Sequence, residues 1–176
     1  MELKSYLAGT QARILAKVES LAQSEAEAAT TGAWSIDEIL EHLAITERGI
    51  LVMSKRALRQ QVAGEAELAE TAGKLELIGE RVAKRVSRIE APPRVRPTGS
   101  LGIWPASLTA FLESRAKMIE MAEQVSEEHD RRTLEHPVLG KMTLRQWLWF
   151  TAAHSERHAA QIEDQLSGSD DLGPRI

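Results

Sequence analysis

The chain has no cysteine among its 176 residues. This absence excludes disulfide bonds, thiolate zinc sites and cysteine nucleophiles. Long apolar runs are also missing, because no window approaches the ~20 consecutive apolar residues that span a membrane. The N-terminal stretch likewise lacks the apolar core of a signal peptide. We therefore expect a cytoplasmic protein that does not associate with membranes.

A strong excess of charge of one sign is absent as well. The formal net charge is −4, and the nearest approach to a basic run, RVAKRVSR at 81–88, is interrupted by apolar residues. Without a basic patch, nucleic acid is not an expected partner. The sequence also contains no phosphate-binding glycine loop, no GxSxG elbow, no HExxH motif and no Glu-x-x-His pair of the kind found in di-iron bundles.

Apolar residues recur at intervals of three, four and seven along most of the chain, which is the spacing of amphipathic helices. No stretch sustains the period of two that is typical of a β-strand. Two helix starts carry capping boxes, in which Ser35 pairs with Glu38 and Thr143 with Gln146. The last long helix runs from the second box to about Leu166. The apolar stripe of the first long helix contains Leu3, Leu7, Ile14, Val18 and Leu21, and that of the second contains Ile36, Ile39, Leu43, Ile50 and Met53. The stripe of the third contains Leu108, Phe111, Leu112, Ile119, Ala122 and Val125.

Four long helices and one shorter helix predict an all-α fold, a four-helix bundle. Short loops join the first helix to the second and the third to the fourth, which favours two antiparallel pairs. The long crossover between the second and third helices can traverse the bundle, so these two helices can run parallel. We expect one domain over residues 1–168 and a flexible C-terminal tail at 169–176. The short helix in the crossover is predicted from Leu75, Ile78, Val82, Val86 and Ile89.

His154 and His158 lie four residues apart in the last predicted helix, in the stretch TAAHSERHAA. They continue a stripe that contains Trp147, Thr151 and Ile162, so both are expected to face the core. This spacing alone fits a metal site, a proton relay or two surface histidines that fall in phase by chance. Inward-facing imidazoles need a metal, a carboxylate or water to satisfy their nitrogens.

His42 lies on the second predicted helix, on a stripe next to the apolar one, and is expected at the interior or its edge. Three neutral imidazoles from two facing helices can take three corners of a tetrahedron or one face of an octahedron, which leaves the other positions open. We interpret His42, His154 and His158 as candidate ligands of a divalent metal, with simple core packing as the alternative. Glu38, one turn before His42, is a candidate to orient it if the capping box leaves its carboxylate free.

The two remaining histidines have different surroundings. His129 lies in the polar stretch SEEHDRR at 126–132, for which we predict a solvated helix end. His136 precedes Pro137 in the turn HPVLGKMT, and a residue before proline is held extended. We therefore predict that His136 shapes this turn rather than binding a metal.

Two motifs in the chain resemble those of the DinB-like superfamily. The first is W-S-x-x-E-x-x-x-H, formed here by Trp34, Ser35, Glu38 and His42. The second is HPVLGKMTLRQWLWFTAAHSERHAAQIE at 136–163. The resemblance extends from about residue 3 to residue 166 and implies a four-helix bundle with up-down-down-up topology.

The resemblance also implies a divalent metal, often nickel or zinc, bound by His42, His154 and His158. Iron, copper and manganese are the alternative metals. Members of the family are frequently homodimers, and some are S-transferases that use low-molecular-weight thiols such as bacillithiol or mycothiol. The long segment 62–104 matches no particular branch of the family.

We therefore expect a metal-dependent enzyme, such as a thiol S-transferase acting on small electrophiles, in which the metal lowers the pKa of the thiol. One alternative is hydrolysis by metal-activated water, and another is a non-enzymatic bundle that binds a metal or ligand. The expected partners are a small-molecule substrate and, in a homodimer, a second copy of the chain.

Overall fold

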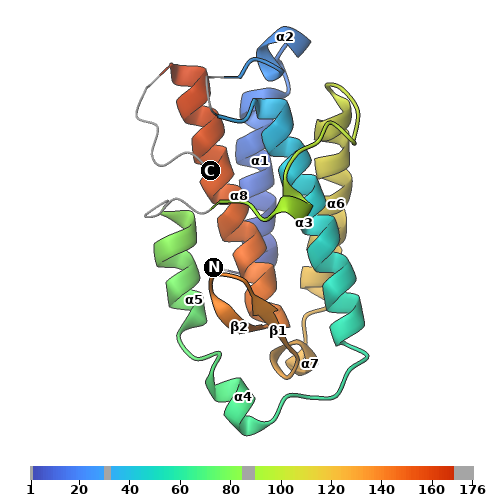
Figure 1. Ribbon diagram of the computed structural model, residues 1–176, viewed down its shortest axis with the longest axis vertical. Helices are drawn as coiled ribbons and strands as arrows, with labels where there is room; N and C mark the ends of the chain where they lie inside the picture. The colour runs from blue at the N-terminus through green and yellow to red at the C-terminus, as the bar shows by residue number, and fades with distance from the viewer. Residues whose placement is uncertain (1, 30–32, 85–89, 169–176) are drawn as a thin grey trace.

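The computed structural model describes residues 2–29, 33–84 and 90–168. Four long helices form a bundle, namely α1 (Leu3–Val18), α3 (Ile36–Ala57), α6 (Ala106–Glu123) and α8 (Leu144–Ser167) (Figure 1). Shorter elements occupy the connections: α2 (Gln23–Ala26), α4 (Glu65–Ala69), α5 (Lys74–Leu77), the π-helical η1 (Ile78–Ala83), the 3-10 turn η2 (Pro93–Val95) and α7 (Glu127–Asp130).

The directions of the long helices follow from contacts near their ends. The hydroxyl of Ser107 donates to Asp37, which joins the starts of α6 and α3, so these helices run parallel. Near the end of α8, Gln165 donates to the carbonyl of Trp34 at the start of α3, so α8 is antiparallel to α3. An ion pair joins the first turn of α1 to the last turn of α6, which makes that pair antiparallel. The topology is therefore up-down-down-up, and this prediction is confirmed.

Both predicted capping boxes are present. The amide of Glu38 donates to the Ser35 hydroxyl at 3.2 Å, and the amide of Ser35 donates to the Glu38 carboxylate at 2.8 Å. Thr143 and Gln146 make the same reciprocal bonds at 3.2 and 2.9 Å. Each box satisfies backbone amides that a helix start leaves unpaired, which fixes where α3 and α8 begin.

The crossover differs in part from the prediction. Ile78 and Val82 are buried, but they lie on the π-helical η1 that follows the short α5 rather than on one regular α-helix. Leu75 is exposed. The last part of the predicted helix falls at residues 85–89, and the predicted tail at 169–176; both lie outside the described residues.

A small β-hairpin, which the helical prediction missed, precedes α8. Strands β1 (Thr133–His136) and β2 (Gly140–Thr143) are antiparallel, with Leu134 opposite Met142. Gly140 has a φ of 69°, a left-handed conformation that favours glycine, where the chain leaves the turn. The second strand runs directly into the N-cap of α8, so the hairpin sets the position of that helix.

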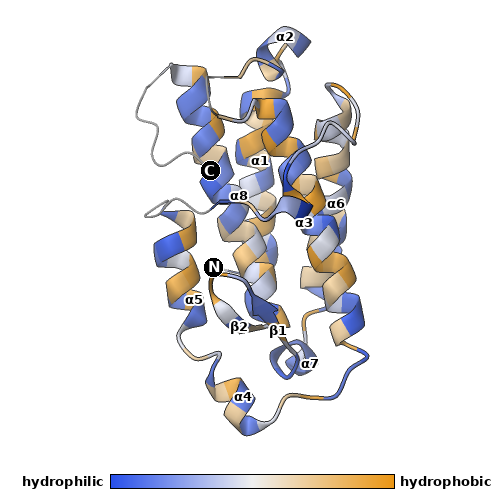
Figure 2. Cartoon of the chain, viewed as in Figure 1, coloured by the Kyte–Doolittle hydropathy of each residue, from blue (hydrophilic) through white to orange (hydrophobic). Residues whose placement is uncertain are grey.

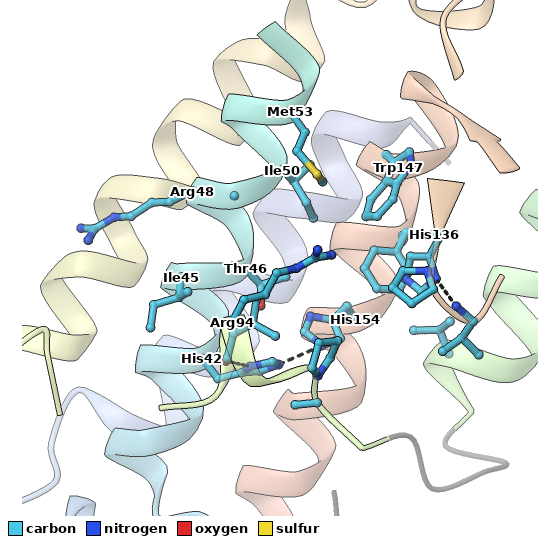
Figure 3. Close-up of a pocket in the computed structure, with 18 of the residues that line it drawn as sticks. His42, Ile45, Thr46, Arg48, Ile50, Met53, Arg94, His136, Trp147 and His154 are labelled. Atoms are coloured by element: carbon cyan, nitrogen blue, oxygen red, sulfur yellow. Dashed lines mark hydrogen bonds between the residues drawn. The ribbon is translucent and has the colours of Figure 1, made fainter. Parts of the chain in front are cut away.

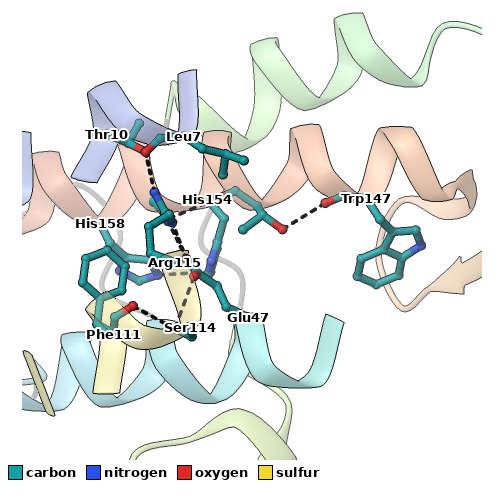
Figure 4. Close-up of polar contacts among 11 residues, drawn as sticks. Leu7, Thr10, Glu47, Phe111, Ser114, Arg115, Trp147, His154 and His158 are labelled. Carbon is teal, nitrogen blue, oxygen red and sulfur yellow. Dashed lines mark hydrogen bonds and ion pairs between the residues drawn. The ribbon is translucent and has the colours of Figure 1, made fainter. Parts of the chain in front are cut away.

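Polar side chains cross the interior between two apolar clusters. Arg115 of α6 is fully buried and donates to Glu47 of α3, with its Nε 3.1 Å from the carboxylate. The same guanidinium donates to Ser155 of α8 and, from α1, to the Thr10 hydroxyl at 2.9 Å and the Leu7 carbonyl at 2.8 Å. All four long helices therefore meet at one buried cation (Figure 4).

Hydrophilic and hydrophobic residues share each long helix, as Figure 2 shows. Within the described part of the chain, no helix has the length and apolar character needed to cross a membrane. The amphipathic pattern instead matches helices that bury one face against their neighbours.

Candidate metal centre

The structure brings the three predicted histidines together. Nε2 of His154 lies 3.2 Å from Nε2 of His42 on α3 and 3.2 Å from Nε2 of His158, one turn further along α8. Tetrahedral zinc with Zn–N bonds of ~2.1 Å places its nitrogens about 3.4 Å apart. Three nitrogens at this separation could therefore hold one ion between them.

Hydrogen bonds on the far side of two rings fix their tautomers. Nδ1 of His42 lies 2.6 Å from the backbone carbonyl of Val95, and a carbonyl only accepts, so Nδ1 carries the proton. Nδ1 of His158 lies 3.0 Å from Oε1 of Gln161, which assigns its proton in the same way. Both Nε2 atoms therefore present lone pairs to the centre, and outer contacts of this kind orient metal-binding histidines.

Burial also keeps His42 and His154 neutral. His42 is 3% exposed and His158 is 0% exposed, while His154 is partly buried. Burial lowers the pKa of His42, and burial together with the nearby His158 and His42 holds the pKa of His154 well below its usual value. Neutral imidazole is the form that binds metal ions.

The residue that orients His42 is not the one predicted. The Glu38 carboxylate is engaged with the amide of Ser35 in the capping box, and the Val95 carbonyl takes the place expected for it. Glu38 is a candidate only if the capping box leaves it free, and this condition is not met. Val95 acts through its backbone, so its side chain gives no sequence signal, and the sequence identified its surroundings only as a loop.

Glu41, the residue before His42, holds the loop that contains Val95. Glu41 is buried, and its carboxylate accepts from the amides of Gly99 at 2.8 Å, Ser100 at 2.9 Å and Thr98 at 3.2 Å. Burial works against ionisation, but these hydrogen bonds keep the pKa of Glu41 below its usual value. Two adjacent residues of α3 therefore hold this loop: His42 at Val95 and Glu41 at residues 98–100.

A cavity of about 580 Å³ opens beside this histidine cluster, and two of its members, His42 and His154, line the cavity (Figure 3). Phe150 stacks on His154, with ring centroids 5.4 Å apart and planes inclined by 16°. Among the described residues that line the cavity there is no aspartate or glutamate. Its walls are mostly apolar, and they include Ile50, Met53, Val82, Val95, Trp147 and Phe150.

His136 shapes the hairpin turn, as predicted, and it also lines the cavity. Its Nδ1 accepts from the amides of Val138 and Leu139, both at 3.1 Å. The ring packs against Trp147 and Phe150, with centroids 4.9 and 4.6 Å apart. His136 therefore lies at the cavity wall without joining the three converging histidines.

His129 does not have the solvated environment that its polar neighbours suggested. It is 6% exposed, and its Nδ1 accepts from the amide of Ser126 at 3.2 Å at the start of α7. Burial, and then the charge of Arg145, lower its pKa. The solvated prediction is wrong because α8 packs against α7, where its Arg145 pairs with Asp130 beside His129.

The fold is an up-down-down-up four-helix bundle in which three histidines of the second and fourth long helices converge and could hold a metal ion. These features define a class of helical bundles with a candidate metal site. The chain belongs to the DinB superfamily, whose family model matches residues 6–162. The resemblance seen in the sequence is thereby confirmed.

The chain is also similar to two proteins of Bacillus subtilis. It is 30% identical over 133 residues to "Uncharacterized protein YuaE" of Bacillus subtilis (strain 168), a match that covers 74% of this chain and 76% of that protein. Its fold is similar to that of YfiT from Bacillus subtilis, with a TM-score of 0.61 and 17% identity over 94% of this chain and 85% of the other. YfiT is described as a probable metal-dependent hydrolase with an unusual four-helix bundle topology.

Proposed function

We propose that the chain is a metal-dependent enzyme that joins a low-molecular-weight thiol to a small electrophile, with a divalent ion held by His42, His154 and His158. The observation that carries this proposal is the convergence of three Nε2 atoms beside an apolar cavity. Zinc and nickel are the metals we favour, and a bound ion of this kind lowers the pKa of a thiol or water molecule that it binds.

The residues around the cavity favour a thiol over water as the nucleophile. Hydrolysis is assisted by a group that accepts a proton from water, but the described lining offers no carboxylate for this role. His136 does not supply one either, because Nδ1 is occupied by two amides and Nε2 carries the proton of the neutral ring. A thiol has a pKa of about 8.5 and needs far less assistance to ionise.

The apolar walls support a small apolar electrophile as the second substrate. Trp147, Phe150 and Met53 provide two aromatic faces and one flexible thioether side chain. Such surfaces bind flat or aliphatic molecules and exclude water from the reacting atoms. Excluding water also protects an electrophile from hydrolysis while it awaits the thiolate.

Hydrolysis is the second candidate, favoured by the likeness to YfiT, which is described as a probable metal-dependent hydrolase.

We further propose that residues 1–168 act as a single domain and that the protein is a homodimer, as the family resemblance implies. The size exclusion profile with light scattering tests the homodimer directly.

The test compares zinc-loaded, nickel-loaded and chelator-treated protein. Each is incubated with bacillithiol, mycothiol or glutathione and with 1-chloro-2,4-dinitrobenzene or a styrene epoxide, and products are followed by mass spectrometry. Transfer predicts a conjugate that requires both metal and thiol, whereas loss of electrophile without thiol indicates hydrolysis. Bound metal without turnover in any combination contradicts both enzymatic candidates and favours a bundle that only binds metal. A His129→Gln variant, which replaces a histidine outside the centre, is the control for the effect of replacing any histidine.

A further inference from the structure

Three arginines line the cavity, namely Arg48, Arg94 and Arg157. Arg157 is engaged in contacts of its own, whereas Arg94 has no protein partner among the described residues. Arg94 belongs to η2, lines the cavity and extends across it in Figure 3. Arg48 also belongs to the lining, but Figure 3 shows it directed away from the other labelled side chains, and its guanidinium lies 3.6 Å from Glu113. Arg94 therefore offers donors to a ligand, whereas Arg48 is engaged by a carboxylate.

His136 supplies a second donor to the same cavity. Because the amides of Val138 and Leu139 donate to Nδ1, the proton of the neutral ring is on Nε2. No described residue accepts a hydrogen bond from this Nε2–H. Burial, and then the charge of Arg94, lower the pKa of His136 to about 4, so the ring is a neutral donor at neutral pH. Figure 3 shows the Arg94 side chain extending toward the side of the cavity where His136 lies.

The backbone that carries Arg94 is held firmly. The next residue, Val95, accepts from His42, and the segment 98–100 is bound by Glu41. Prolines before and after the turn further restrict its φ angles. A donor on such a turn loses little backbone entropy when it binds a ligand.

We propose that the Arg94 guanidinium and the Nε2–H of His136 form an anion-binding subsite, and that a substrate of this centre is an apolar molecule bearing a carboxylate. That such a substrate is converted rests on the proposed function, whereas its binding to the subsite does not. A carboxylate matches the planar fork of a guanidinium and still leaves a lone pair for the imidazole N–H. Phosphate would bring a second negative charge into mostly apolar surroundings. The apolar body would then lie against Trp147 and Met53.

The test measures binding to chelator-treated protein by calorimetry, so that a metal ion cannot attract the anion. The ligands are 4-phenylbutyrate, its neutral amide 4-phenylbutyramide, and phenyl phosphate. Wild type should bind the acid about tenfold more tightly than the amide, as expected for a charge-assisted pair. Arg94→Gln should remove this preference, while the matched control Arg48→Gln should retain it. His136→Phe, which keeps an aromatic ring against Trp147, should weaken the acid and spare the amide.

Several results would overturn the subsite. Equal binding of acid and amide, or no binding of either at millimolar concentration, removes the case for an anion site. An equal loss in Arg48→Gln would assign the preference to the overall field of the protein rather than to Arg94. Tighter binding of phenyl phosphate would contradict the carboxylate assignment. Circular dichroism and the metal affinity of each variant check that the bundle and the three histidines are intact. Because this binding is measured without metal or turnover, its failure is separate from a failure of the proposed function.

Discussion

The backbone carbonyl of Val95 lies 2.6 Å from Nδ1 of His42, although the two residues are 53 positions apart in the chain. This contact makes the last loop of the crossover part of the candidate metal centre, because it determines which nitrogen of His42 faces the other two histidines. The loop is held in place by Glu41, which adjoins His42 on α3. The state of the loop and the metal affinity of the centre should therefore change together.

Replacing Glu41 with glutamine should loosen this loop. The amides of residues 98–100 would lose a charged acceptor, which costs about 1–3 kcal/mol for a buried group. We expect faster hydrogen exchange at these amides and weaker zinc binding than in wild type. The matched control is Glu38→Gln, which removes the same charge one turn earlier and should leave exchange in the loop unchanged. Unaltered exchange in the Glu41 variant would show that the carboxylate does not hold the loop.

Single replacement of His42, His154 or His158 with alanine should abolish stoichiometric metal binding. Each removes one of the three proposed ligands, and two histidines bind a divalent ion far more weakly than three. Elemental analysis of protein purified without chelator, followed by zinc titration, measures the effect. His129→Gln should retain full metal content, since His129 caps α7 elsewhere. Wild-type protein that neither contains metal nor takes it up would leave core packing as the role of the three histidines.

The helices and the three histidines were predictable because each leaves a local pattern in sequence. Periodic apolar residues mark a helix face, and the phase of His154 and His158 with Trp147 placed both inward. The outer contacts of the centre leave no such pattern. Val95 contributes a carbonyl that any residue has, and Glu41 reaches amides that only the folded loop brings to it.

The buried charges and the hairpin were missed for a different reason. Arg115 and Glu47 are residue types normally exposed, and only their mutual pairing inside the bundle makes their burial tolerable. The strands of the hairpin have four residues each, too few for a period of two to stand out against the helical pattern. Tertiary contacts decided both features.

Removing Arg115 should destabilise the bundle strongly. Its loss leaves Glu47 buried without a partner, and breaking a buried ion pair of this kind costs about 3–5 kcal/mol. Burial already raises the pKa of Glu47, so the orphaned carboxyl should take up a proton. We expect Arg115→Met to lower the midpoint of urea unfolding markedly.

The double variant E47Q/R115M provides the internal comparison for that experiment. It removes both charges together, and its destabilisation should be smaller than the sum of the two single changes. Arg13→Ala, which breaks the half-exposed pair with Glu163, should cost no more than about 1 kcal/mol. A single-variant cost at Arg115 as small as that of Arg13 would contradict the structural importance of the buried pair.

His136 should remain neutral to a lower pH than an ordinary histidine. Burial and Arg94 lower its pKa from 6.5 to about 4, so the unfolded chain takes up a proton at a pH where the folded ring does not. The resulting stability is fully present above pH 6.5 and is lost as the pH falls toward 4.

Nitrogen-15 NMR of metal-free protein should show the proton on Nε2 of His136 but on Nδ1 of His42. The His136 signal is assigned by its absence in His136→Phe, whose unfolding free energy should depend less on pH over this range. Arg94→Gln should raise the pKa of His136, whereas Arg48→Gln should not. A midpoint near 6.5 in wild type would place His136 in water rather than in the cavity wall, and the donor assigned to it would have to be withdrawn.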